Sequence, residues 1–264
     1  MRPPSIDPIE NHLLAMLPAE ERARLFPLLE PVALMLGEVL CESNDSGGYV
    51  HFPTDSIVSL LYLMENGASA EIAVVGNDGM VGIALFMGGG STTTRSVVQS
   101  AGRAFRLSRT RFEAEINRHG VLLDLMLRYS QALITQMAQT AVCNRHHTID
   151  QQLCRWLLLS LDRRPGNELL ATQELIANML GVRREGVTAA AGKLQDMGVI
   201  DYRRGHITVL DRAKLETLVC ECYAVVQCET ERLLPWTPCR KIDSRLWQRD
   251  DKRTFRSLAT TRHA

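Results

Sequence analysis

Short apolar runs separated by turn residues fill about residues 30 to 110 of the chain. Runs such as IVSLLYLM and ASAEIAVV are each long enough for one strand, and Asn66-Gly67 lies between these two. Asn and Gly tolerate the positive φ angles that tight hairpin turns require, so this dipeptide predicts a β-hairpin. Several short strands at this spacing predict a β-sandwich or small β-barrel, preceded by a helical lead-in that begins near Asn11.

Between about residues 120 and 145 the apolar spacing changes to that of a helix. The repeating positions, at intervals of four and three, are Leu123, Leu127, Ser130, Ile134, Met137, Ala141 and Asn144. Such a narrow seam is typical of two long helices packed against each other, and it predicts a dimer interface. The predicted interface residues are Leu123, Leu127, Ile134, Met137 and Ala141. The alternative is a helix that packs only on its own domain.

The rest of the chain divides into a compact domain and a basic tail. Residues 148–234 alternate helical segments with turns and contain a β-hairpin pattern, VIDYRRGHITVLD. Residues 235–264 carry eight Lys or Arg against three Asp and have little apolar periodicity, which predicts a disordered tail. The predicted organisation is therefore a β domain over 1–118, a dimerisation helix over 119–147, a second domain over 148–234 and the tail.

The composition indicates where in the cell the protein works more clearly than what it does. Thirty basic and 30 acidic residues cancel, so any affinity for nucleic acid must come from locally placed charge. Seven cysteines, an odd number, favour reduced thiols over a disulfide framework. The N-terminus lacks a secretory apolar run, and no segment reaches the roughly 18 to 20 apolar residues of a membrane span. We therefore expect a cytoplasmic protein with no membrane partner.

The segment from Gln173 to Gln195 has the pattern of a helix-turn-helix. That motif needs a small residue where the helices approach, a residue tolerant of positive φ at the turn and an apolar residue after it. Ala177, Gly181 and Val187 meet these needs in order. Thr172 is placed to cap the first helix.

The second helix is predicted to begin at Arg183 and to read base edges in the major groove. An arginine fork matches guanine O6 and N7, and a carboxylate can accept from cytosine N4, which suits Arg183, Arg184 and Glu185. Thr188 and Lys193 are expected to add base or phosphate contacts.

A hairpin follows the helix-turn-helix pattern, with Arg203, Arg204 and His206 around a Gly205 turn. Cationic side chains at such a turn form a wing that contacts the phosphate backbone. An ordinary helical hairpin could explain the Ala-Gly-Val spacing alone. The hairpin and the dimer-type helix together favour binding to double-stranded DNA.

This arrangement resembles the Crp/Fnr family of bacterial regulators over about residues 10 to 234. The resemblance is strongest in LIANMLGVRREGVTAAAGKLQDMGVI and the wing, where Arg184 and Glu185 occupy the family's base-reading positions. Arg183 replaces the usual hydroxyl residue and Ala189 stands where members often carry a second base-reading arginine, so the operator sequence stays open. The resemblance implies an α+β fold with a cyclic-nucleotide-binding-like jelly roll, a dimerisation helix and a winged helix-turn-helix. It also implies a homodimeric transcriptional regulator of a palindromic operator, with RNA polymerase as a further partner.

The family's phosphate-binding cassette is only partly present. The resemblance assigns effector binding to Gly79, Gly82, Arg95 and Ser96, but no glutamate stands where the family holds the ribose hydroxyl. We therefore expect a degenerate effector domain, no cyclic AMP and no cofactor. The alternative function is a nucleotide-sensing signalling module whose helix-turn-helix is not the main output.

Two stretches carry metal-ligand residue types, Cys143 with His146 and His147, and Cys220 with Cys222. Neither alone offers four ligands at a familiar spacing, so no metal ligand is assigned, and a metal or redox site stays an alternative to ordinary core cysteines. The β domain offers His51 without the His-x-His cluster of barrel oxygenases, and no nucleophile or phosphate-loop motif occurs. We therefore expect no catalytic residues.

Overall fold

The structure is a computed structural model that describes residues 6–45, 47–88 and 91–235. Apart from its first residue, the predicted basic tail over 235–264 lies outside the described residues, and so does Cys239. No helix in the described part of the chain is long and apolar enough to cross a membrane.

The predicted helical lead-in is confirmed. It consists of the 3-10 turn η1 (Pro8–Glu10), helices α1 (His12–Ala15) and α2 (Ala19–Leu25), and the turn η2 (Phe26–Leu28). The buried side chain of Asn11 accepts from the first amides of α1 and donates to the carbonyls of Pro53 and Gly79 at 2.9 Å each. This one side chain therefore caps the helix and fastens the lead-in to the β domain.

The β domain is a sandwich of two antiparallel sheets. One has the order β1-β7-β3 and the other β2-β6-β4-β5. The strands are β1 (Glu30–Leu34), β2 (Val39–Cys41), β3 (Tyr49–Pro53), β4 (Ile57–Leu63), β5 (Ser69–Val75), β6 (Arg95–Ser100) and β7 (Gly102–Ser108), with the turn η3 (Ile83–Leu85) before β6. The predicted runs omit β3, a short strand that ends in proline, which is unusual within sheets.

The hairpin predicted at Asn66-Gly67 joins β4 to β5. The amide of Met64 donates to the carbonyl of Ala68 at 2.8 Å, which closes a three-residue loop. Of the two turn residues only Gly67 has a positive φ, 83°. The Asn66 side chain instead accepts from the amide of Ala68 at 3.0 Å. A three-residue loop needs one left-handed residue, whereas the expected two-residue turn needs positive φ at its glycine and at Asn66.

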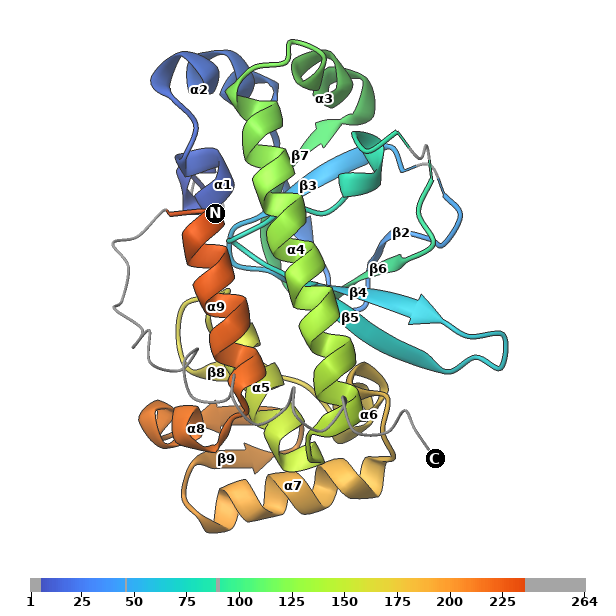
Figure 1. The fold of residues 1–264 in the computed structure, drawn as a ribbon, viewed down its shortest axis with the longest axis vertical. Helices are drawn as coiled ribbons and strands as arrows, with labels where there is room; N and C mark the ends of the chain where they lie inside the picture. Colours follow the sequence, from blue (N-terminus) through green and yellow to red (C-terminus); the bar gives the residue numbers. More distant parts are fainter. Residues whose placement is uncertain (1–5, 46, 89–90, 236–264) are drawn as a thin grey trace, which may run out of the picture.

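A long helix joins the two halves of the molecule (Figure 1). After α3 (Arg109–Ile116), α4 runs over Val121–His146. Its buried residues Leu122, Leu125 and Met126 belong to the same core as the sandwich residues Phe52 and Leu107. Helix α9 (Glu221–Leu233), to which the sequence analysis assigned no element, lies along α4.

The C-terminal half is a winged helix-turn-helix, which confirms the predicted fold class. It comprises α5 (Ile149–Leu161), β8 (Glu168–Leu170), α6 (Gln173–Leu180), α7 (Arg184–Asp196), β9 (Ile200–Arg203), β10 (His206–Val209) and α8 (Arg212–Leu218). Helix α7 packs against α5 and α6, and the small sheet has the order β8-β10-β9.

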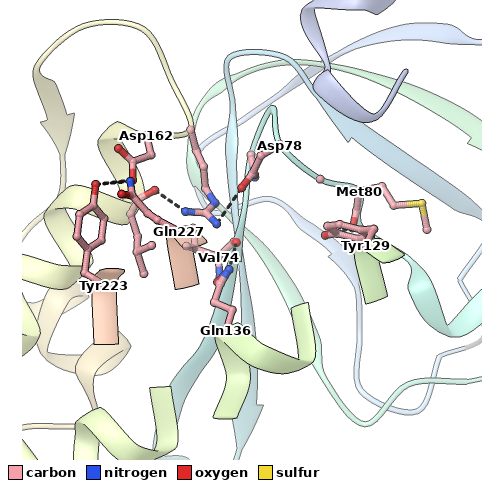
Figure 2. Close-up of polar contacts among 12 residues, drawn as sticks. Val74, Asp78, Met80, Tyr129, Gln136, Asp162, Tyr223 and Gln227 are labelled. Carbon is pink, nitrogen blue, oxygen red and sulfur yellow. Dashed lines mark hydrogen bonds and ion pairs between the residues drawn. The ribbon is translucent and has the colours of Figure 1, made fainter. Parts of the chain in front are cut away.

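The two halves are joined by apolar and polar contacts. Ile57, Leu61 and Val74 of the sandwich belong to the core of the C-terminal half. Figure 2 shows polar contacts in this region, among them Gln136, which pairs with the backbone of Val74 and so fixes α4 to β5. The buried guanidinium of Arg163 lies 2.9 Å from the carboxylate of Asp78. The C-terminal half is therefore docked on the sandwich.

Candidate nucleic-acid interface

The turn between α6 and α7 is built by short-range interactions. Thr172 caps α6 by accepting from the amide of Leu175 at 3.1 Å. Gly181 ends that helix with a φ of 65°, in the left-handed region where a side chain is strained. Ala177 and Val187 are buried where the two helices approach. Each residue type expected for the motif therefore has the predicted local role.

Helix α7 begins at Arg184, one residue later than predicted. Arg183 has extended backbone angles, φ −75° and ψ 145°, because it occupies the position that precedes the first helical residue. Arg183, Arg184 and Glu185 are exposed. Within the described residues, none of these three side chains forms an ion pair or hydrogen bond, so all three are available to an external partner.

Thr188 and Lys193 are exposed but already engaged. The Thr188 hydroxyl lies 2.7 Å from the side-chain oxygen of Gln173 and 3.0 Å from the carbonyl of Arg184. The Lys193 ammonium lies 2.7 Å from the carboxylate of Asp150. Contacts of either residue with DNA would have to replace or share these interactions.

The wing is the hairpin between β9 and β10. Arg204 and Gly205 at its tip both have positive φ, 52° and 81°, as a two-residue hairpin turn requires. Arg203, Arg204 and His206 are exposed, with Arg203 paired to Asp201 at 3.0 Å.

The first strand of the wing, β9, packs on α7. The Tyr202 hydroxyl donates to the carbonyl of Ala171 at 2.8 Å, which fixes β9 to the residue just before the cap of α6. Burial raises the pKa of Tyr202 to about 12, and the positive charge of Arg184 acts in the opposite direction. Arg184 is therefore close enough for its charge to reach the base of the wing.

Two features of α7 were absent from the sequence-based site. A Cβ at Gly186 would lie 2.7 Å from the side chain of Ile149, so this glycine lets α7 approach α5. A glycine inside a helical pattern is the sequence signal for such a contact. Ala189 and Gly192 leave the solvent side of α7 with little side-chain bulk, and a Cβ at Gly192 would meet no atom within 4 Å.

The predicted seam of α4 divides between two faces. Leu127 and Ile134 are 54% and 56% exposed, and Ala141 is also exposed. Leu123 and Met137 pack partly against the core of their own chain, and Ser130 is buried. Packing on its own domain therefore accounts for one face of α4, while an apolar stripe with a seven-residue spacing faces outward.

The four effector-binding candidates do not form one site. A Cβ at Gly79 would lie 2.6 Å from the hydroxyl of Tyr129, which donates to the carbonyl of Met80 (Figure 2). Arg95 forms an ion pair with Glu42 at 3.1 Å. The other two candidates, Gly82 and Ser96, line a cavity of about 40 Å³ inside the sandwich, and neither Gly79 nor Arg95 lines it.

The order of the two halves matches two family models. Residues 31–119 match the model of the cyclic nucleotide-binding domain, and residues 151–218 match the model of the Crp-like helix-turn-helix domain. The chain belongs to the Crp/Fnr family. Members of this family are transcriptional regulators, generally not enzymes, whose helix-turn-helix domains bind DNA and which act as dimers.

Solved structures of similar fold are described as regulators. A Crp/Fnr-family regulator from Eubacterium rectale has 18% identity and a TM-score of 0.59, covering 78% of this chain and 96% of its own. The c-di-GMP-responsive regulator CLP of Xanthomonas campestris has 14% identity and a TM-score of 0.59, covering 74% and 100%. A Crp/Fnr-family regulator from Thermus thermophilus, TTHA1359, has 21% identity and a TM-score of 0.57, covering 72% and 97%. No curated protein matches the chain.

Proposed function

We propose that this Crp/Fnr regulator acts in the cytoplasm as a homodimer that recognises a palindromic operator through α7. The observation that carries the proposal is the exposed set of Arg183, Arg184 and Glu185 at the start of α7, with no partner inside the described part of the chain. Charged side chains at this end of a recognition helix are in the position that reads bases. RNA polymerase is the expected further partner.

Each recognition residue has a distinct expected role. Arg184 and Glu185 read bases, and Arg183 reads a base or an adjacent phosphate. Arg203, Arg204 and His206 of the wing contact the backbone, which adds affinity without sequence preference. Thr172, Thr188 and Lys193 supply supporting contacts. The low bulk of Ala189 and Gly192 allows the helix to approach the groove closely.

The outward apolar stripe of α4 supports the homodimer. Leu127, Ile134 and Ala141 lie on one helix face at intervals of seven, so a second copy of α4 would bury them in both chains. A twofold axis along this helix pair would present two copies of α7 to half-sites about one helical turn of DNA apart.

The sandwich is proposed to act without a cyclic mononucleotide. Arg95, the phosphate-binding candidate, already forms an ion pair with Glu42. The cavity of about 40 Å³ has space for a water molecule or two, whereas a nucleotide needs several hundred Å³.

In vitro selection from random duplex DNA by the purified, ligand-free chain tests the proposed function. The expected result is a palindromic motif bound by two chains, with an affinity that falls steeply as salt rises. Selection repeated with cell-extract metabolites distinguishes an effector-dependent regulator, for which a motif is enriched only in their presence. Failure to enrich any motif under both conditions would contradict the proposal and favour the nucleotide-sensing alternative.

A further inference from the structure

The two cysteine-containing stretches, which are far apart in the sequence, meet at one end of α4. Cys143 lies in the last turn of α4 and His147 directly follows that helix, four residues later. Cys220 precedes α9 and Cys222 lies in its first turn. One ligand atom from each of these four residues lies within 4.8 Å of the other three. His146, the neighbour of His147, is exposed and does not belong to this group.

The spacing of these atoms is close to that around a tetrahedral metal ion. The Sγ atoms of Cys143 and Cys220 are 3.6 Å apart, and Sγ of Cys222 lies 3.5 Å from Nδ1 of His147. Bonds of about 2.3 Å to sulfur and about 2.0 Å to nitrogen place tetrahedral ligands roughly 3.5 to 3.8 Å from one another. A central ion therefore requires shifts of about 1 Å or less.

The second ring nitrogen of His147 is also placed as in metal sites. Its Nε2 lies 3.3 Å from the carboxylate of Glu221, the residue between the two α9 cysteines. A histidine that binds metal through one nitrogen commonly donates its other N–H to a carboxylate, which fixes the tautomer and the ring orientation. Nδ1, facing Cys222, is then the ligand atom.

Burial disfavours free thiolates, so thiolate ligands at this position need compensating positive charge. The three cysteines are buried, and His147 is partly buried. Cys220 and Cys222 lie at the N-terminal end of α9, and the positive end of a helix dipole stabilises thiolates. The buried guanidinium of Arg155 interacts electrostatically with the thiols of Cys143 and Cys222. Its positive charge offsets the net negative charge that three thiolates leave around a divalent ion.

We propose that Cys143, His147, Cys220 and Cys222 form a tetrahedral zinc site with three thiolate ligands and one imidazole ligand. The soft thiolate ligands and the tetrahedral arrangement both favour zinc among divalent ions. Three sulfur ligands and one nitrogen ligand are typical of a structural zinc site with no open coordination position. The ion would join the end of α4 to the start of α9 and so fix the helix that follows the winged domain to the dimerisation helix.

Titration of the reduced, chelator-treated full chain with Co²⁺ tests the proposal. We expect one Co²⁺ per chain, thiolate-to-cobalt charge-transfer bands, the visible bands of tetrahedral cobalt and full displacement by Zn²⁺. A reduced chain that binds no Co²⁺, or binds it without thiolate bands, would overturn the proposal. Formation of a Cys143–Cys220 disulfide by a chain that binds no metal when reduced would overturn it in favour of a redox pair.

Variants identify the ligands. His147→Gln, at a partly exposed position that should leave the fold intact, is expected to lower metal affinity at least tenfold and to shift the cobalt bands. Cys220→Ser should do the same, and Glu221→Ala should lower affinity by roughly 10-fold to 100-fold through the histidine. Cys41→Ser, at a thiol outside the group, is the matched control and should bind like the parent chain. Unchanged spectra in both His147→Gln and Cys220→Ser would exclude this set of ligands.

Discussion

The sandwich matches the model of the cyclic nucleotide-binding domain and the winged domain matches that of the Crp-like helix-turn-helix, yet the two domains treat their motif residues in opposite ways. In the winged domain, Arg183 and Arg184 are exposed and unengaged within the described residues. In the sandwich, Arg95 is paired with Glu42, and Gly79 accommodates the ring of Tyr129. A domain can therefore keep the fold of its family while the side chains of its binding motif become occupied by contacts within the chain. The contacts of each motif side chain indicate which of the two domains can still bind an external ligand.

The largest expected effect concerns the stripe that would hold two winged domains together. Ile134→Glu places a carboxylate in each half of the proposed interface, at a cost of about 2 kcal/mol per chain. The dimer dissociation constant should rise roughly a thousandfold in sedimentation equilibrium, with loss of operator binding. Ile9→Glu, at an isoleucine that is 44% exposed and lies in η1 instead of α4, is the matched control. An unchanged dimer in Ile134→Glu would place the interface elsewhere.

The second effect tests the exposed end of α7. Arg184→Ala removes one bidentate base contact, so specific affinity should fall about 10-fold to 100-fold while affinity for scrambled duplex changes little. Fluorescence anisotropy with the two duplexes measures the difference. Arg111→Ala, an exposed arginine on α3, should leave both affinities unchanged. An equal loss on both duplexes would assign Arg184 to a phosphate.

The third effect arises where the two regions meet, at Glu71 of β5. Burial raises the pKa of Glu71 to about 7, although a hydrogen bond from Ser59 and the charges of Arg155 and Arg163 act in the opposite direction. The folded pKa lies above the unfolded one, so this residue stabilises the fold at low pH, and the contribution is lost as pH rises through 7.

Chemical denaturation at several pH values measures the effect of Glu71. The free energy of unfolding should fall by about 1 kcal/mol from about pH 6 to about pH 8 in the parent chain. This dependence should be absent in Glu71→Gln and retained in Glu65→Gln at the exposed hairpin tip. Strong destabilisation of Glu71→Gln at pH 8 would instead indicate a charged Glu71 paired with arginine.

The smallest effect is expected in the sandwich. Arg95→Ala removes a partly exposed ion pair, so the free energy of unfolding should change by less than about 1 kcal/mol. Calorimetry with cyclic AMP should give no binding heat for the parent or the variant. Saturable heat in the parent that disappears in Arg95→Ala would show that the sandwich retains a nucleotide site.

The winged domain was predictable because its determinants are local. Thr172, Gly181 and the Arg204-Gly205 turn act on backbone atoms within a few residues, so sequence spacing alone indicates their roles. The predicted start of α7 was one residue too early, because a sequence pattern does not distinguish the N-cap residue from the first residue of the helix.

Contacts between distant segments were not predictable from spacing. Cys143 and Cys220 are 77 residues apart, and only the return of α9 along α4 brings them together. The engagement of Arg95 by Glu42 likewise depends on how the strands pair. The apolar spacing in α4 could not indicate which positions face the core of the same chain. One helix can pack on its own core with one face and on a second chain with another, and both faces have apolar residues.

The return of α9 along α4 also limits how the winged domain can move. A domain connected by one hinge can swing as a unit when a few backbone angles change. Here the polypeptide leaves the long helix after His146 and comes back to it through α9, so the domain is tethered at its entrance and at its exit. Reorientation of the DNA-reading surface therefore requires both connections to change conformation together, which favours an all-or-none transition over a graded one.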